Sequence, residues 1–140
     1  NTNTRIEKLK NFLIAKRKQL ITSLILIILI LITFFGYQEF KSSSKEKLAN
    51  KFNSIVTNFE TGKKENININ LIEIINTKDK TYSPLAFFFL LDNDLITSSN
   101  EINSYFDLLI NEVSLDEEIK NLTIYKKVYL TQTLFKKTSY

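Results

Sequence analysis

The residues of this chain that could do chemistry are few, and they are mainly carboxylates. The sequence has no histidine and no cysteine, which removes the usual metal ligands and most nucleophile–base pairs. Asp92, Asn93 and Asp94 begin like a calcium-binding loop. The positions that follow lack the Asp or Asn, the Gly and the bidentate Glu that such a loop needs. The pattern therefore favours a solvated turn between two helices.

A second acidic group, Asp116 to Glu118, stands where a helix is expected to begin. The helix macrodipole favours acids in a first turn, so this placement needs no catalytic carboxylate pair to explain it. Asn121-Leu122-Thr123 matches a glycosylation acceptor but falls within the same expected helix. Neither GxxxxGK[ST] nor GxGxxG occurs. We expect no enzyme activity, no cofactor, no metal and no small-molecule substrate.

The elements that must position these residues follow an uncharged apolar stretch from Leu20 to Tyr37. Its 18 residues include 13 Leu, Ile or Phe. As a helix it would span about 27 Å, close to the hydrocarbon thickness of a bilayer. A buried core helix would show a polar face, and a cleaved signal peptide would have a shorter apolar stretch. We therefore predict a transmembrane helix over residues 20–37, with five representative lipid-facing positions: Leu20, Leu24, Ile28, Leu31 and Phe35.

The charge on either side of this stretch predicts its orientation. Residues 1–19 carry six Lys or Arg against one Glu, and Lys16, Arg17 and Lys18 stand closest to the stretch. The residues after Tyr37 carry 13 Lys and 14 Asp or Glu. Because basic segments resist translocation, we expect a cytoplasmic N-terminus and a main domain, residues 38–140, on the far side of the membrane. If the source is bacterial, these are the inner membrane and the periplasm. Residues 5–18 either extend the anchor helix, lie on the inner leaflet or form a disordered retention signal.

The main domain is predicted to be all-α, with helices joined by short loops. Residues 45–59 carry one apolar face: Leu48, Ala49, Phe52, Ile55, Val56 and Phe59. Ser43 and Glu46 fit a capping box that would start a separate helix there. The alternative is one helix that continues unbroken from the membrane. In both cases Gly62 is the expected stop.

The pattern further along predicts four more helices. Residues 65–76 fit either a strand or a helix, and we favour the helix because a lone strand would have no partner. Ser83 and Pro84 are expected as N-cap and first helical residue of an apolar helix that reaches Leu91. Capping boxes at Ser98 and Ser114 predict two further helices, the last from about Leu115 to Phe135. The helix after Ser98 should bury one stripe: Ile102, Tyr105, Phe106, Leu109 and Val113.

The spacing of these helices indicates helical hairpins of the tetratricopeptide-like, α-solenoid type. One helix pair has a cap-to-cap spacing of 31 residues, from Ser83 to Ser114, near the 34 of a tetratricopeptide unit. The small side chain of Ala86 would let the neighbouring helix approach closely.

The order of segments resembles a known family. A basic N-terminus precedes an anchor ending FFGYQEF, and YSPLAFFFLLDNDLI and NEINSYFDLLIN follow. This resembles the tetratricopeptide-repeat-like ancillary subunit of the bacterial Sec translocon over residues 20–135, most specifically in Tyr82–Leu91 and Asn100–Asn111. The resemblance implies a single-pass anchor, a periplasmic helical-repeat domain, and association with translocon subunits and periplasmic folding factors.

The last predicted helix carries two apolar stripes. Ile119, Leu122, Tyr125 and Tyr129 form the first stripe. Because a terminal repeat helix should have a polar outside, two stripes suggest that something else covers the second one. The alternatives are a further helix of a longer chain beyond Tyr140, a partner or dimer surface, and exposed apolar surface with no role. The candidate partner surface consists of Ile124, Val128 and Phe135.

These observations favour a membrane-anchored protein-interaction protein, scaffold-like or chaperone-like, whose partners are membrane lipid and other proteins. The alternative is a structural accessory subunit of a larger membrane protein complex. The net charge of +4 is mostly the topology signal of residues 1–19, and the main domain has no basic stripe with interleaved aromatics. We therefore expect no nucleic-acid partner.

Overall fold

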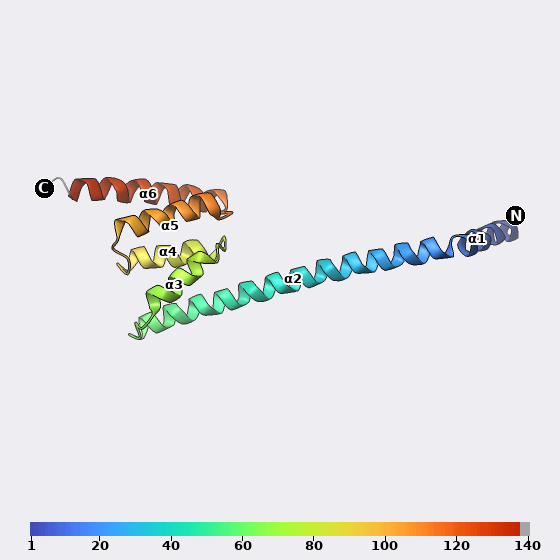
Figure 1. The fold of residues 1–140 in the computed structure, drawn as a ribbon, viewed down its shortest axis with the longest axis horizontal. Helices are drawn as coiled ribbons and strands as arrows, with labels where there is room; N and C mark the ends of the chain where they lie inside the picture. The colour runs from blue at the N-terminus through green and yellow to red at the C-terminus, as the bar shows by residue number, and fades with distance from the viewer. Residues whose placement is uncertain (138–140) are drawn as a thin grey trace. The chain divides into compact units, whose positions relative to one another are not determined.

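The computed structural model describes residues 1–137, with every side chain among them except that of Phe135. Within this range all regular structure is helical, which confirms the all-α prediction. The chain divides into two compact units, Asn1–Lys45 and Glu46–Tyr140. The six helices, labelled in Figure 1, are α1 (Thr2–Ala15), α2 (Arg17–Glu60), α3 (Ile67–Asn76), α4 (Tyr82–Asp92), α5 (Ser99–Glu112) and α6 (Glu117–Lys137).

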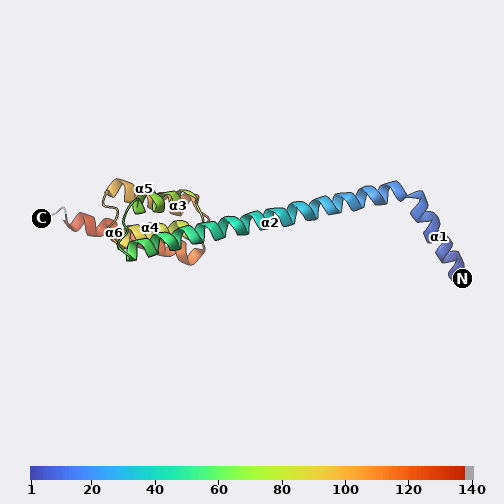
Figure 2. The same ribbon diagram turned by 90° about the horizontal axis from the view of Figure 1, so that it is seen from below.

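The first unit contains α1 and the beginning of α2, which Figure 2 shows from a second side. Lys16, with φ −105° and ψ 15°, separates the two helices, so the basic N-terminal segment forms a helix of its own. Within the described residues, α2 is the one helix long and apolar enough to span a membrane, and its apolar window has no buried residue. Thr22 and Thr33 donate hydrogen bonds to the carbonyls of Lys18 and Leu29, which satisfies these hydroxyls without water.

Helix α2 continues without a break to Glu60, so residues 45–59 follow the continuous alternative rather than a separate helix started at Ser43. Gly62, at φ 83°, ends the helix as expected, and the amides of Gly62 and Lys63 bond to the carbonyls of Phe59 and Asn58. The predicted apolar face of this segment is confirmed, since all six of its residues are buried or half-buried.

The core of the second unit lies between successive helices. Helix α3 packs on α4, α4 on α5 and α5 on α6, and the last three alternate in direction (Figure 1). The helix favoured for residues 65–76 is confirmed as α3. The rings of Phe87 on α4 and Phe106 on α5 meet edge to face with centroids 4.8 Å apart. The fully buried apolar residues of these helices include Leu71, Ile74, Ile75, Ala86, Phe87, Leu90, Phe106 and Leu109.

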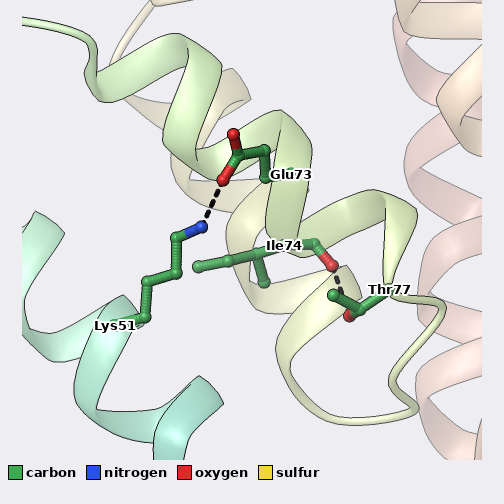
Figure 3. A network of polar contacts seen from close by, with 4 residues as sticks. All are labelled: Lys51, Glu73, Ile74 and Thr77. Carbon is green, nitrogen blue, oxygen red and sulfur yellow. Dashed lines mark hydrogen bonds and ion pairs between the residues drawn. The ribbon is translucent and has the colours of Figure 1, made fainter.

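An ion pair and two ring contacts join the end of α2 to this core. Lys51 on α2 reaches the carboxylate of Glu73 on α3 (Figure 3). One turn further along α3, the Thr77 hydroxyl donates to the carbonyl of Ile74 at 2.6 Å, which caps the end of that helix. The rings of Phe52 and Phe59 on α2 also pack against Phe89 on α4.

The predicted start of α4 is wrong by two residues. The residue before the helix is Thr81, and the Asp79 carboxylate accepts hydrogen bonds from the amides of Thr81 and Tyr82 at 2.8 and 2.7 Å. Ser83 lies inside the first turn, where it is fully buried and donates its hydroxyl to the carbonyl of Ile74 at 3.1 Å. Its role is therefore to join α4 to α3, because a buried hydroxyl needs a partner.

The two later helix starts differ in outcome. Ser98 is the N-cap of α5 as predicted, and its Oγ accepts from the amide of Glu101 at 3.4 Å. Helix α6 begins at Glu117, two residues later than expected, so Ser114 does not stand next to it. The stripe predicted for α5 is confirmed: Phe106, Leu109 and Val113 are buried, and Ile102 and Tyr105 are half-buried.

Candidate interaction surface

Helix α6 packs on the rest of the domain through a face that is largely polar. Thr123 at its centre is fully buried, and its hydroxyl donates to the carbonyl of Ile119 at 2.7 Å. The spacing places these residues on one side of a helix with 3.6 residues per turn. The packed residues are Ile119, Thr123, Lys126, Lys127, Leu130 and Thr131, buried or half-buried.

Two lysines hold this packed face to the neighbouring helices. The Nζ of Lys127 lies 2.6 Å from Oδ1 of Asp107 on α5. The Nζ of Lys126 lies 3.6 Å from Oδ1 of Asp92 at the end of α4, and 4.8 Å from the centroid of the Phe88 ring. The long alkyl parts of both lysines thus cover apolar surface while their ammonium groups stay paired.

The opposite side of α6 is apolar and exposed. Four side chains at i, i+1, i+4 and i+5 occupy it, and we call them the α6 outer face. Their exposed fractions are 40% for Ile124, 67% for Tyr125, 50% for Val128 and 59% for Tyr129. The two tyrosine rings stack with centroids 6.4 Å apart and an interplanar angle of 19°. The face is therefore a continuous, ordered patch rather than scattered single side chains.

The structure regroups the two stripes that the sequence suggested. Of the candidate partner residues, Ile124 and Val128 lie on the α6 outer face, and the side chain of Phe135 is outside what the structure describes. Tyr125 and Tyr129, assigned to the other stripe, lie beside them, while Ile119 of that stripe packs inward. The i, i+1, i+4, i+5 spacing places these four residues on one side of a helix. It does not show whether that side packs against the domain or faces solvent.

The residues assigned to the anchor and to topology all lie in the first unit. Leu20, Leu24, Ile28, Leu31 and Phe35 are exposed along α2. Lys16 stands at the break between α1 and α2, and Arg17 and Lys18 form the first turn of α2. The macrodipole disfavours cations at that end of a helix, so helix stability does not account for them. The predicted orientation gives them a role in topology instead.

The acidic groups considered for chemistry have structural roles. Asp92 ends α4 and pairs with Lys126, and Asp94 adopts a left-handed conformation, φ 52°, in the connection that follows. Asp116 precedes α6 and lies 3.6 Å from Nζ of Lys80, and Glu117 opens the first turn of that helix. Within residues 1–137, no cluster of three or more His, Cys, Asp or Glu could hold a metal ion.

The second unit has a perturbed tyrosine and a small cleft besides the α6 outer face. Burial, and then the charge of Glu101, raises the pKa of Tyr105 above its usual value near 10. A cleft of about 160 Å³ lies between α3 and the α4–α5 connection, where Asn68 donates a 2.6 Å hydrogen bond to the carbonyl of Leu95. This volume is small beside the roughly 300–1,000 Å³ of ligand pockets. Two hollows, of about 470 Å³ along α5 and about 570 Å³ around the α2–α3 connection, are larger, but all except one of the residues that line each of them are exposed, as in a shallow surface depression. The α6 outer face is therefore the stronger candidate.

Comparison of the chain with protein-family profiles, with curated proteins and with solved structures gives no match.

Proposed function

We propose that this chain is a single-pass membrane protein whose helical domain binds other proteins close to the membrane. The observation that carries the proposal is the α6 outer face, a side of a well-packed helix that presents Ile124, Tyr125, Val128 and Tyr129 to solvent. Aromatic and branched aliphatic residues gathered on one helix side are typical of surfaces that dock against another helix or groove.

The long apolar helix supports the membrane part of the proposal. An unburied, uncharged stretch of this length is far more stable in hydrocarbon than in water, because each buried Leu, Ile or Phe contributes favourably to transfer. Thr22 and Thr33 fit this setting, since their hydroxyls are satisfied by the helix itself. The cluster of six basic residues before the stretch supports a cytoplasmic N-terminus.

The resemblance of the segment order to the ancillary subunit of the Sec translocon supplies the proposed partners. These are translocon subunits and periplasmic folding factors, held near chains that emerge from the membrane. In this proposal the helices of the second unit form a tetratricopeptide-like scaffold, and the scaffold binds a helix of its partner through α6.

Site-specific photo-crosslinking in membranes of the native host tests the proposal. A photoreactive phenylalanine analogue replaces Val128 on the α6 outer face, and in a matched control it replaces Asn103, which is exposed on α5. We expect the Val128 variant to form adducts that contain translocon subunits or periplasmic folding factors, identified by mass spectrometry. The Asn103 variant should form few or none.

Two outcomes would contradict the proposal. Equal adduct formation from both positions would show that the α6 outer face has no binding role. Adducts confined to one fixed complex that lacks translocon subunits would favour a structural accessory subunit instead.

Protease added outside spheroplasts tests the orientation. It should digest the second unit, and protection of the second unit would refute the proposed orientation.

A further inference from the structure

The α6 outer face continues at both ends into charged residues of opposite sign. Glu117 and Glu118 lie in the first turn of α6, and Lys136 and Lys137 lie in the last turn. Acids near a helix N-terminus and lysines near its C-terminus suit the macrodipole, so this distribution alone indicates no partner. The order of the residues between the two ends adds the second observation.

Four pairs of residues on this side of α6 match or complement each other in chemical type about a midpoint between Lys126 and Lys127, whereas a fifth pair, Glu118 and Phe135, does not. Tyr125 and Val128 are equidistant from that point, and so are Ile124 and Tyr129, all exposed and apolar. Further out, the exposed amides Asn121 and Gln132 are equidistant from it. At the ends, the acid Glu117 is matched by the base Lys136. At 100° per residue, the mean direction of every such pair lies opposite the packed side of the helix.

We propose that, where no other protein occupies it, the α6 outer face binds a second copy of this chain through an antiparallel α6–α6 pair about a two-fold axis. The inference rests on the proposed function only in taking this face as the binding surface. In the antiparallel arrangement Tyr125 faces Val128 of the other copy. Likewise, Asn121 faces Gln132 of the other copy, and Glu117 faces its Lys136. Such an isologous contact needs one patch that complements itself, as this patch does.

Charge decides between the two possible helix directions. A parallel pair would place Glu117 beside Glu117 and Lys136 beside Lys136, with the two macrodipoles aligned side by side, and all of these contacts are repulsive. The antiparallel pair turns each of them into an attraction. One face of a 21-residue helix is small beside the roughly 800 Å² per partner of a standard interface, so the dimer is weak. Confinement of both copies to one membrane raises their effective concentration and favours pairing.

Disulfide cross-linking of the full chain in membranes tests the pair directly, because the natural sequence has no cysteine. Two differently tagged copies are co-expressed, one carrying Asn121→Cys and the other Gln132→Cys. We expect oxidation to link these two copies into a species of about twice the 16.4 kDa chain mass. Asn121→Cys should not link to itself, since the two positions would be about 16 Å apart along the antiparallel pair, beyond the reach of a disulfide.

Matched controls separate pairing from random collision and from loss of fold. Asn103→Cys on α5 is equally exposed and should give only background cross-linking. Glu117→Lys or Lys136→Glu alone should lower the yield of the mixed disulfide several-fold, and the two changes together should restore it. Val128→Asp should abolish the mixed disulfide, with an unchanged thermal unfolding curve by circular dichroism.

The outcomes distinguish this inference from the proposed function. A mixed disulfide at the Asn103→Cys background, or Asn121→Cys linking to itself as efficiently, overturns the antiparallel dimer. Failure of the double charge reversal to restore the yield overturns it as well. If Val128 still forms photo-adducts with translocon subunits in those cases, the binding face stands and its occupant is another protein. If photo-adducts are lost but the mixed disulfide forms, the dimer stands and the proposed partners fall.

Discussion

Helices α5 and α6 pack against each other, yet they bury opposite kinds of residue. Helix α5 turns its aromatic and aliphatic stripe inward, and Phe106 is 1% exposed. Helix α6 turns Thr123, Lys126 and Lys127 inward and leaves Tyr125 in solvent. An apolar helix face is stable once another element covers it. Within the described fold, the apolar stripe of α5 is covered by neighbouring helices, whereas the α6 outer face is not.

The neighbours of each helix explain the difference. Helix α5 contacts both α4 and α6, so its stripe meets the ring of Phe87 and the apolar residues beside it. Helix α6 packs on α5 and also reaches the end of α4, and there its lysines meet the carboxylates of Asp107 on α5 and Asp92 on α4. Lysines suit these contacts because their stems are apolar and their ammonium groups reach the acids.

Truncation of one aromatic residue on each helix gives the largest expected contrast. Phe106→Ala should lower the free energy of unfolding by about 3–5 kcal/mol, because it leaves a cavity in the core. Tyr125→Ala should change it by less than about 0.5 kcal/mol, because that side chain is exposed. Urea unfolding of the full chain in detergent, followed by circular dichroism, measures both. Similar losses for the two variants would break the comparison.

Enlarging the buried threonine on α6 should have the next largest effect. Thr123→Leu is expected to destabilise the protein by about 1–3 kcal/mol, because the fully buried site between α5 and α6 has no room for a larger side chain. Gln132→Leu, on the exposed side of the same helix, is the matched control and should stay within about 0.5 kcal/mol. A neutral Thr123→Leu would show that α6 docks loosely.

Removing a lysine from the packed side of α6 should have a smaller effect. Lys127→Ala loses both the ion pair with Asp107 and the packing of the stem, and we expect a loss of about 0.5–1 kcal/mol. Lys127→Met keeps most of the apolar stem and should lose less. Unfolding at low and high salt separates the two contributions, since salt screens the ion pair alone. An equal loss for both variants would assign the whole effect to charge.

The smallest expected effect concerns the pH dependence of α5. Because the pKa of Tyr105 is raised in the folded state, that state holds the phenol proton more tightly than the unfolded chain. The stability from this group is fully present below about pH 10 and is lost as pH rises through the folded pKa. Across that pH range, the midpoint temperature of thermal unfolding should fall more steeply for the natural protein than for Tyr105→Phe. Parallel curves would contradict the raised pKa.

Local sequence patterns predicted most of the helical elements, but they left open whether residues 45–59 start a separate helix and whether residues 5–18 form a helix. The length and composition of residues 20–37, the period of residues 48–59, the stop at Gly62 and the cap at Ser98 each depend on interactions within a few residues. The starts of α4 and α6 were placed two residues off. At α4, Asp79 supplies the cap and Ser83 is drawn into a contact with Ile74, nine residues earlier in the chain.

The sequence by itself determined that α6 is a helix with more apolar residues than one packed side can use. Only the tertiary structure decided which side packs, because the residues that this side meets, Asp92 and Asp107 among them, come from α4 and α5, 20 or more residues away along the chain. Helical periodicity is a property of one segment, whereas the choice of its buried side depends on the charge and shape of its neighbours. That choice is what leaves Ile124, Tyr125, Val128 and Tyr129 facing outward.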